Sequence, residues 1–255
     1  MAVSPRLALL FHQSPSFKTY LSFAHGFRAP TLDDMCRNGN ITKGFKKANP
    51  LLGPENLNNF ELGYSAGVNS KLKIAQSAFV SAGNEFQYFI ANGDSVYTGG
   101  NNLKPVMQRQ NISNVLIYGT EVSLSWQPFN SLSVLANYAW NHAEIRSSEN
   151  SNGRSLEGKR LMEVPEHQAS GAIEWRYKWF MAGASLAYTG KLFADDDNLI
   201  VNQARTETGV RVSANYHERV YLSLSMQDVL NNRYTDSKGN ISPGRFMMCS
   251  VIWKW

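Results

Sequence analysis

The chain has 255 residues, 43% of them hydrophobic, and a formal net charge of +5 at pH 7. No apolar run reaches the roughly 18 residues of a membrane-spanning helix, which excludes that class but not a membrane β-barrel, because barrel strands are apolar on one face only. Lys and Arg are scattered along the chain, so nucleic-acid binding is not indicated. Cys36 and Cys249 lie far apart in unlike contexts and define neither a disulfide framework nor a metal site.

Apolar and polar residues alternate along most of the sequence, which is the pattern of strands with one apolar and one polar face. Most of the alternating segments are about 10–14 residues long, longer than usual in globular sheets and suited to strands tilted across a bilayer. We expect strands near residues 7–11, 18–23, 59–68, 72–80, 118–127, 132–141, 168–177, 180–188, 207–216, 220–227 and 244–255.

The connections alternate between turns of a few residues and long polar segments. Short periplasmic turns and long external loops are typical of outer-membrane barrels. We expect the long loops near residues 26–53, 91–111, 144–163 and 195–197. In the last of these, three adjacent Asp carboxylates do not easily face one ion, so a solvated acidic loop is favoured over a Ca²⁺ site.

The charged residues of the expected strands fall on the polar face together with Ser, Asn and Gln. That face is not a sandwich core, because unpaired buried charge is costly, and it predicts a wet lumen. The aromatic residues of the other face predict girdles at the lipid–water boundary. The charged set is Glu121, Glu174, Arg176, Glu207 and Arg211. The aromatic set is Trp126, Tyr138, Trp140, Trp175, Tyr177 and Tyr188.

The sequence therefore predicts an all-β fold, an antiparallel transmembrane β-barrel with about 11 strands in this chain. Bacterial barrels usually have an even number of strands, whereas here the first strand is expected to begin on the loop side, opposite the C-terminus. Residues 1–6 show no signal-peptide pattern. We interpret residues 1–255 as the C-terminal portion of a larger barrel whose earlier strands are absent.

Several short motifs in fixed order resemble those of TonB-dependent outer-membrane receptors, over essentially the whole chain. The two most distinctive boxes are Phe27-Arg28-Ala29-Pro30 and Asn49-Pro50-Leu51. Further matching motifs lie at residues 53–63, 118–121, 164–167, 228–234 and 242–245.

The resemblance implies the C-terminal strands of a 22-stranded barrel that an N-terminal globular domain plugs, in the outer membrane of a Gram-negative bacterium and in contact with its lipid. Members of the family import scarce nutrients with energy from the inner-membrane TonB complex, which here would act through the absent N-terminal part. The plug domain and the TonB box are absent from residues 1–255, and the resemblance implies no resident cofactor.

A ferric siderophore is the expected ligand, with haem as the alternative. Haem receptors usually carry a ligand His between the two boxes, and no His lies between Pro30 and Asn49. Arg28 could bind an anionic ligand through bidentate hydrogen bonds, or it could anchor its own loop. The loop lysines could attract an anionic ligand by electrostatic steering, or they could simply be solvated. The candidate ligand-binding residues are His25, Arg28, Lys43, Lys46, Lys47 and His142, with the two histidines as haem ligands or plain strand-end residues.

Two alternatives of other classes stay open. A lipase-like barrel enzyme needs a Ser aligned with a His on one outer strand face, and no such Ser accompanies His142 or His167, so no catalytic residue is expected. A passive porin would not need the motifs that resemble those of TonB-dependent receptors, so their presence argues against this alternative.

Overall fold

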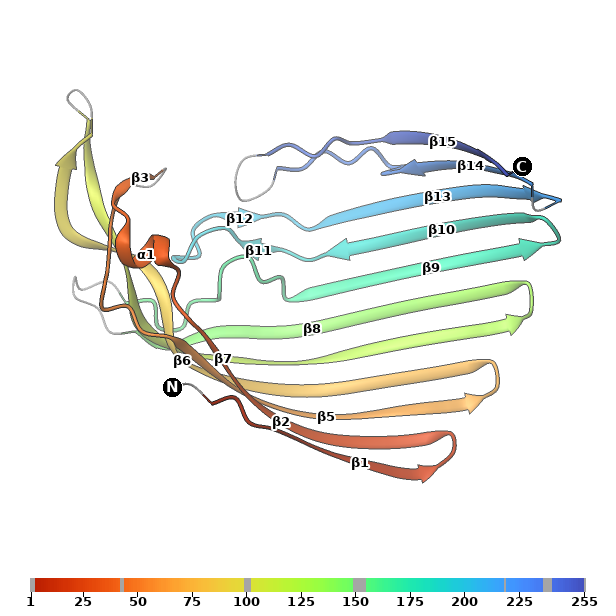
Figure 1. The fold of residues 1–255 in the computed structure, drawn as a ribbon, viewed down its shortest axis with the longest axis horizontal. Helices are drawn as coiled ribbons and strands as arrows, with labels where there is room; N and C mark the ends of the chain where they lie inside the picture. Colours follow the sequence, from red (N-terminus) through yellow and green to blue (C-terminus); the bar gives the residue numbers. More distant parts are fainter. Residues whose placement is uncertain are drawn as a thin grey trace.

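The computed structural model describes residues 3–41, 44–98, 102–148, 155–217, 219–235 and 240–254. Eleven long antiparallel strands follow one another across a single curved sheet (Figure 1), which confirms the expected all-β fold. In sheet order they are β1 (Arg6–Ser14), β2 (Phe17–Arg28), β5 (Glu55–Asn69), β6 (Leu72–Tyr97), β7 (Leu103–Phe129), β8 (Leu132–Ser148), β9 (His167–Tyr177), β10 (Phe180–Thr189), β13 (Arg205–Tyr216), β14 (Val220–Gln227) and β15 (Phe246–Trp253).

Smaller elements gather at the loop end of the sheet. They are α1 (Leu32–Cys36), β3 (Gly39–Ile41), β4 (Gly44–Lys47), β11 (Leu192–Phe193) and β12 (Val201–Asn202). Within the described ranges, no helix has the length and apolar character needed to cross a membrane.

Strand register carries the predicted alternation across the whole sheet. Tyr20 pairs with Gly63, Gly63 with Ser77 and Ser77 with Glu121, so this row of residues shares one face. The opposite face carries large apolar side chains that are about half exposed, such as Leu62 at 59%. A solvent-exposed apolar face of this extent is expected only where lipid covers it, and the register confirms the assignment of a polar lumen face and an apolar outward face.

The predicted aromatic residues all lie on the outward face. Trp126, Trp175 and Tyr177 stand next to short turns, whereas Tyr138, Trp140 and Tyr188 lie toward the loop end. Tyr118 joins the second group by an edge-on contact with Trp140, with ring centroids 5.8 Å apart. The two groups are placed as the two girdles of a membrane barrel would be.

The long connections differ from the sequence prediction. Residues 91–97 and 103–111 are not loop, because β6 and β7 continue through them and form a long hairpin arm. Register shifts at Gly83/Phe86 and Ala91/Ser95 break the alternation there, which removed the sequence signal. The described residues of the segment 26–53 also form regular structure, since they include α1, β3 and β4, and β4 pairs in parallel with β7 through Phe45 and Val106.

The buried core of the described residues is small and lies toward the loop end of β6, β7 and β8. It contains Tyr88, Ile112, Val115, Ile145 and Leu156. β6, β7 and the end of β8 supply the first four of these residues, and the loop after β8 supplies Leu156. The loops therefore form a packed assembly on one end of the barrel wall.

Figure 1 shows the N-terminal end of the chain on the loop side and the C-terminal end on the turn side, as expected from the strand count. β1 and β15 occupy the two edges of the sheet and do not pair with each other in the part of the chain that the structure describes.

Candidate functional site

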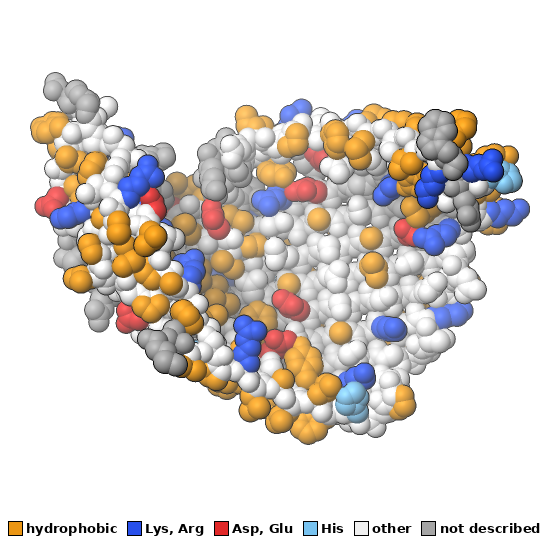
Figure 2. Space-filling model, in the orientation of Figure 1, with side chains coloured by type: hydrophobic (Ala, Val, Ile, Leu, Met, Phe, Trp, Pro, Cys, Tyr) orange, Lys and Arg blue, Asp and Glu red, His pale blue; other side chains and the backbone are white. Residues whose placement is uncertain are grey.

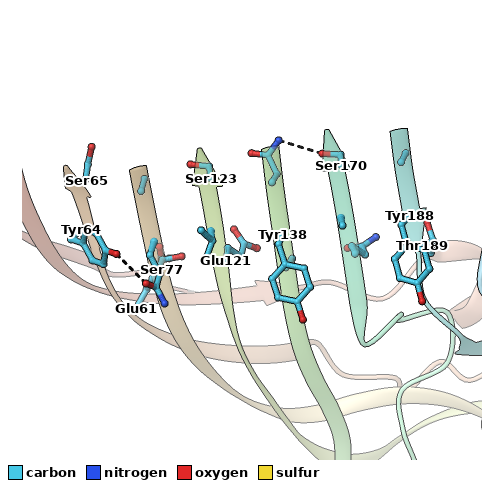
Figure 3. Close-up of a pocket in the computed structure, with 18 of the residues that line it drawn as sticks. Glu61, Tyr64, Ser65, Ser77, Glu121, Ser123, Tyr138, Ser170, Tyr188 and Thr189 are labelled. Atoms are coloured by element: carbon cyan, nitrogen blue, oxygen red, sulfur yellow. Dashed lines mark hydrogen bonds between the residues drawn. The ribbon is translucent and has the colours of Figure 1, made fainter. Parts of the chain in front are cut away.

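The concave face of the sheet is a polar wall (Figure 2). A groove of about 600 Å³ runs along it. Glu61, Ser77, Glu121, Ser123 and Ser170 lie on neighbouring strands of this wall (Figure 3). The hydroxyl of Tyr20 donates to Glu61, so one carboxylate is held by its neighbour. Small hydroxyl and amide side chains leave room inside the barrel and offer hydrogen bonds to whatever fills it.

A buried ionic cluster fastens the segment 31–47 to the hairpin arm. Lys46, on β4, has a side chain that is only 6% exposed and contacts Asp33 and Asp34, the latter at 2.9 Å. Arg109, on β7, lies 3.2 Å from the other oxygen of Asp34 and over the ring of Phe89. Each buried charge is paired, as burial requires.

The local fold of this cluster comes from a helix cap. The Thr31 hydroxyl oxygen accepts from the backbone N–H of Asp34 and starts the five-residue helix α1, which presents both aspartates to Lys46. Sequence reasoning missed Asp33, Asp34 and Arg109, although Thr followed three residues later by an acidic residue is a recognisable capping pattern.

The two family boxes lie at the ends of the same loop. Arg28 forms a bidentate pair with Glu55, at 2.5 Å and 2.7 Å, and Glu55 is itself almost fully buried. Asn49 donates to the backbone carbonyl of Arg109 at 2.9 Å, while Leu51 is exposed. The side chains of Arg28 and Asn49 therefore attach the loop to the barrel wall at Glu55 and to the arm at Arg109. Phe27, by strand alternation, points to the outward face, and Ala29 and Pro30 directly follow β2.

The two candidate histidines point away from the lumen. His25 shares the outward face with Phe27, and its Nδ1 lies 2.9 Å from the side-chain oxygen of Asn58. His142 stacks on Tyr118 on the outward face. Both of its ring nitrogens are engaged, Nε2 with Glu144 at 2.9 Å and Nδ1 with Arg160. Neither imidazole therefore reaches the concave wall.

The three loop lysines have different positions. Lys46 is buried and its charge is compensated by Asp33 and Asp34, so it is not the solvated lysine that the sequence suggested. Lys47 is exposed on the same short strand. Lys43 lies outside the described residues. Electrostatic steering by these lysines stays a prediction.

The acidic loop also differs from expectation. Asp195 is buried rather than solvated, because its carboxylate accepts the backbone N–H groups of Leu199 and Ile200, the latter at 2.7 Å, and closes a turn between β11 and β12. Among the described residues, no group of three His, Cys, Asp or Glu side chains is arranged to hold a metal ion.

The ionic cluster should be insensitive to pH across the neutral range. Burial raises the pKa of Asp34, but hydrogen bonds from Lys46 and Thr31 and the charge of Arg109 outweigh it, so the pKa of Asp34 lies below its ordinary 3.8. Burial acts against the charged form of Lys46, yet the two aspartates raise its pKa above the ordinary 10.5. An acid whose pKa is lowered by folding stabilises the fold at pH values above its ordinary pKa, and this stabilisation is lost as the pH falls through its pKa in the folded state. A lysine whose pKa is raised by folding stabilises the fold at pH values below its ordinary pKa, and this stabilisation is lost as the pH rises through its pKa in the folded state.

We expect the loop to stay fixed from about pH 5 to pH 9 and to loosen below about pH 4. A nitroxide label on exposed Cys36, with Cys249 replaced by serine, reports this as line narrowing in the electron paramagnetic resonance spectrum of the complete receptor. Narrowing that begins near pH 6 would contradict the assignment to Asp34.

Comparison with known proteins decides the family. Residues 1–229 match the family model described as TonB dependent receptor-like, beta-barrel. The chain belongs to the TonB-dependent receptor family. It is accordingly part of an integral β-barrel of the Gram-negative outer membrane, in a family of receptors rather than enzymes.

Individual TonB-dependent receptors resemble the chain over part of their length. The iron-regulated outer membrane virulence protein of Vibrio cholerae serotype O1 is 26% identical over 218 residues, which cover 81% of this chain and 32% of that protein. The chain therefore spans about a third of the length of that curated relative.

Two solved structures show the same fold. The ferric yersiniabactin uptake receptor FyuA of Yersinia pestis superposes with a TM-score of 0.74 at 16% identity, over 98% of this chain and 37% of that one. A mutant of the ferric enterobactin receptor PfeA of Pseudomonas aeruginosa gives the same TM-score and identity, over 98% and 40%. Both matches show the fold of this chain, which covers less than half of each of those two structures.

Proposed function

We propose that the chain forms the C-terminal wall of a receptor that imports a ferric siderophore with energy from the TonB complex. The observation that carries this proposal is the family match over residues 1–229. The relative and both structures named above are described as iron-regulated or as receptors for ferric chelates, which favours iron among the nutrients of the family. The polar wall and the packed loops suit a hydrophilic ligand that enters from the loop end.

Haem is the weaker ligand candidate. A haem receptor needs an axial ligand, most often an imidazole, on the path of the ligand. His25 lies on the outward face, and both ring nitrogens of His142 are engaged by Glu144 and Arg160. These positions support a siderophore over haem.

The uptake of iron tests the proposal. A strain that lacks the complete receptor should lose uptake of radioactive iron from one ferric siderophore under iron limitation, and the restored gene should return it. Deletion of the TonB gene should abolish the same uptake, because transport against a gradient needs that energy. Uptake that is non-saturable and continues without TonB would overturn the proposal in favour of a passive porin.

A further inference from the structure

A cavity of about 340 Å³ lies at the loop end of the concave face, between β2, β5 and β6. Gly26, Arg28 and Leu57 contribute to its lining, and strand register places all three on the lumen side. Its volume is at the lower end of the range for small-molecule sites, about 300–1,000 Å³. The cavity therefore accommodates one substituted ring and not a whole metal chelate.

The apolar walls of the cavity result from two glycines. Gly83 pairs with Leu57, and the ring of Phe86 lies where a side chain at Gly83 would be, which brings that ring to the cavity. Gly26 also pairs with Leu57, and a Cβ built on Gly26 meets no atom within 4 Å. The space above Gly26 is open, and Phe86 and Leu57 supply an apolar surface beside it.

The polar wall of the cavity is formed by Arg28, whose guanidinium is fixed by Glu55. Glu55 accepts from Nε and Nη2 of Arg28 and also from the backbone N–H of Gln87 at 2.9 Å. Glu55 is 7% exposed, whereas the side chain of Arg28 is 67% exposed. A guanidinium has five N–H donors, so the pair with Glu55, made through Nε and Nη2, fixes the group and leaves further donors for another acceptor. A guanidinium held in this way has lost most of its rotamer freedom before a ligand arrives.

We propose that this cavity binds an anionic aromatic group of the transported ligand, such as an aryl carboxylate or a catecholate. The ring would fill the space over Gly26 against Phe86 and Leu57, and the anionic oxygens would accept from the free edge of Arg28. This inference rests on the proposed function and specifies the ligand class: siderophores with aryl acid groups.

Binding of a fluorinated salicylate to the purified complete receptor, followed by fluorine NMR line broadening, tests the site. Gly26→Leu should abolish the broadening by filling the cavity, with little strain because the space is open. The double variant R28Q/E55Q should weaken binding about tenfold or more, since it removes the charged donor without leaving Glu55 buried and unpaired.

A second Arg–Glu pair on the same face is the matched control. Arg176 lies 2.9 Å from Glu174 at the turn end of β9, far from the cavity along the strands. R176Q/E174Q should leave salicylate binding unchanged, and fluorinated salicylamide, which lacks the charge, should bind the wild type far more weakly. Heat-dependent electrophoretic mobility confirms that each variant is folded.

The outcomes separate the site from the proposed function. Equal broadening in the wild type and in folded Gly26→Leu, or equal affinity for salicylate and salicylamide, overturns the site while iron uptake stands. Binding that depends on Gly26 and Arg28 in a receptor that takes up no ferric chelate supports the site and overturns the proposed function. In uptake assays, Gly26→Leu should impair an aryl-bearing ferric siderophore more than a purely hydroxamate one.

Discussion

Replacing Lys46 with methionine should release the segment 31–47 from the hairpin arm of the complete receptor. Methionine keeps most of the volume but removes the cation, so Asp34, whose side chain is 11% exposed, loses its 2.9 Å partner and retains Arg109 and Thr31. Removing one member of a buried ion pair costs about 3 kcal/mol. We therefore expect hydrogen exchange of this segment to accelerate by roughly a hundredfold, measured by mass spectrometry.

Lys47 provides the control for this experiment. It is the next residue on the same strand and is exposed, so Lys47→Met should change exchange little. Equal exchange in the two single methionine variants would show that the ionic cluster does not hold the loop.

Produced by itself, the polypeptide of residues 1–255 should aggregate or pair edge to edge rather than form a stable monomer. β1 and β15, with nine and eight residues, each have one neighbour strand among the described residues, so each presents a row of backbone donors and acceptors at an open edge. Each unpaired backbone group costs several kcal/mol in lipid. We expect sedimentation in detergent to show oligomers or aggregates.

The complete receptor is the reference for this second prediction. It should give a monomer whose electrophoretic mobility changes on heating, as closed barrels do. A heat-modifiable monomer of residues 1–255 alone would mean that the eleven strands close on themselves, which the order of the sheet does not show.

Within the strands, most of the structure followed from the sequence. The alternation in segments such as 118–127 fixed which residues share a face, because a strand has a period of two and a bilayer requires one apolar face. Glu121 and Arg211 were assigned to the lumen for this reason, and the register places them there. The same logic failed at residues 91–97 and 103–111, where a register shift between Ala91 and Ser95 interrupts the period of two.

The candidate site was predictable only in part. The two boxes were visible as motifs, but their partners come from distant strands: Arg28 meets Glu55 and Asn49 meets Arg109, a separation of 60 residues in the second case. A lysine in a polar loop reads as solvated, and only the folded loop brings Asp33 and Asp34 around Lys46. The direction of His25 followed from its register with Asn58.

The sequence by itself determined the class of the fold, the two faces of each strand and the family, because these depend on local periodicity and on short contiguous motifs. The tertiary structure decided which charges are paired, which histidines face outward, and where a cavity lies beside Arg28. These properties depend on strand register and on loops that pack against strands far away in the chain, and neither is encoded by local alternation.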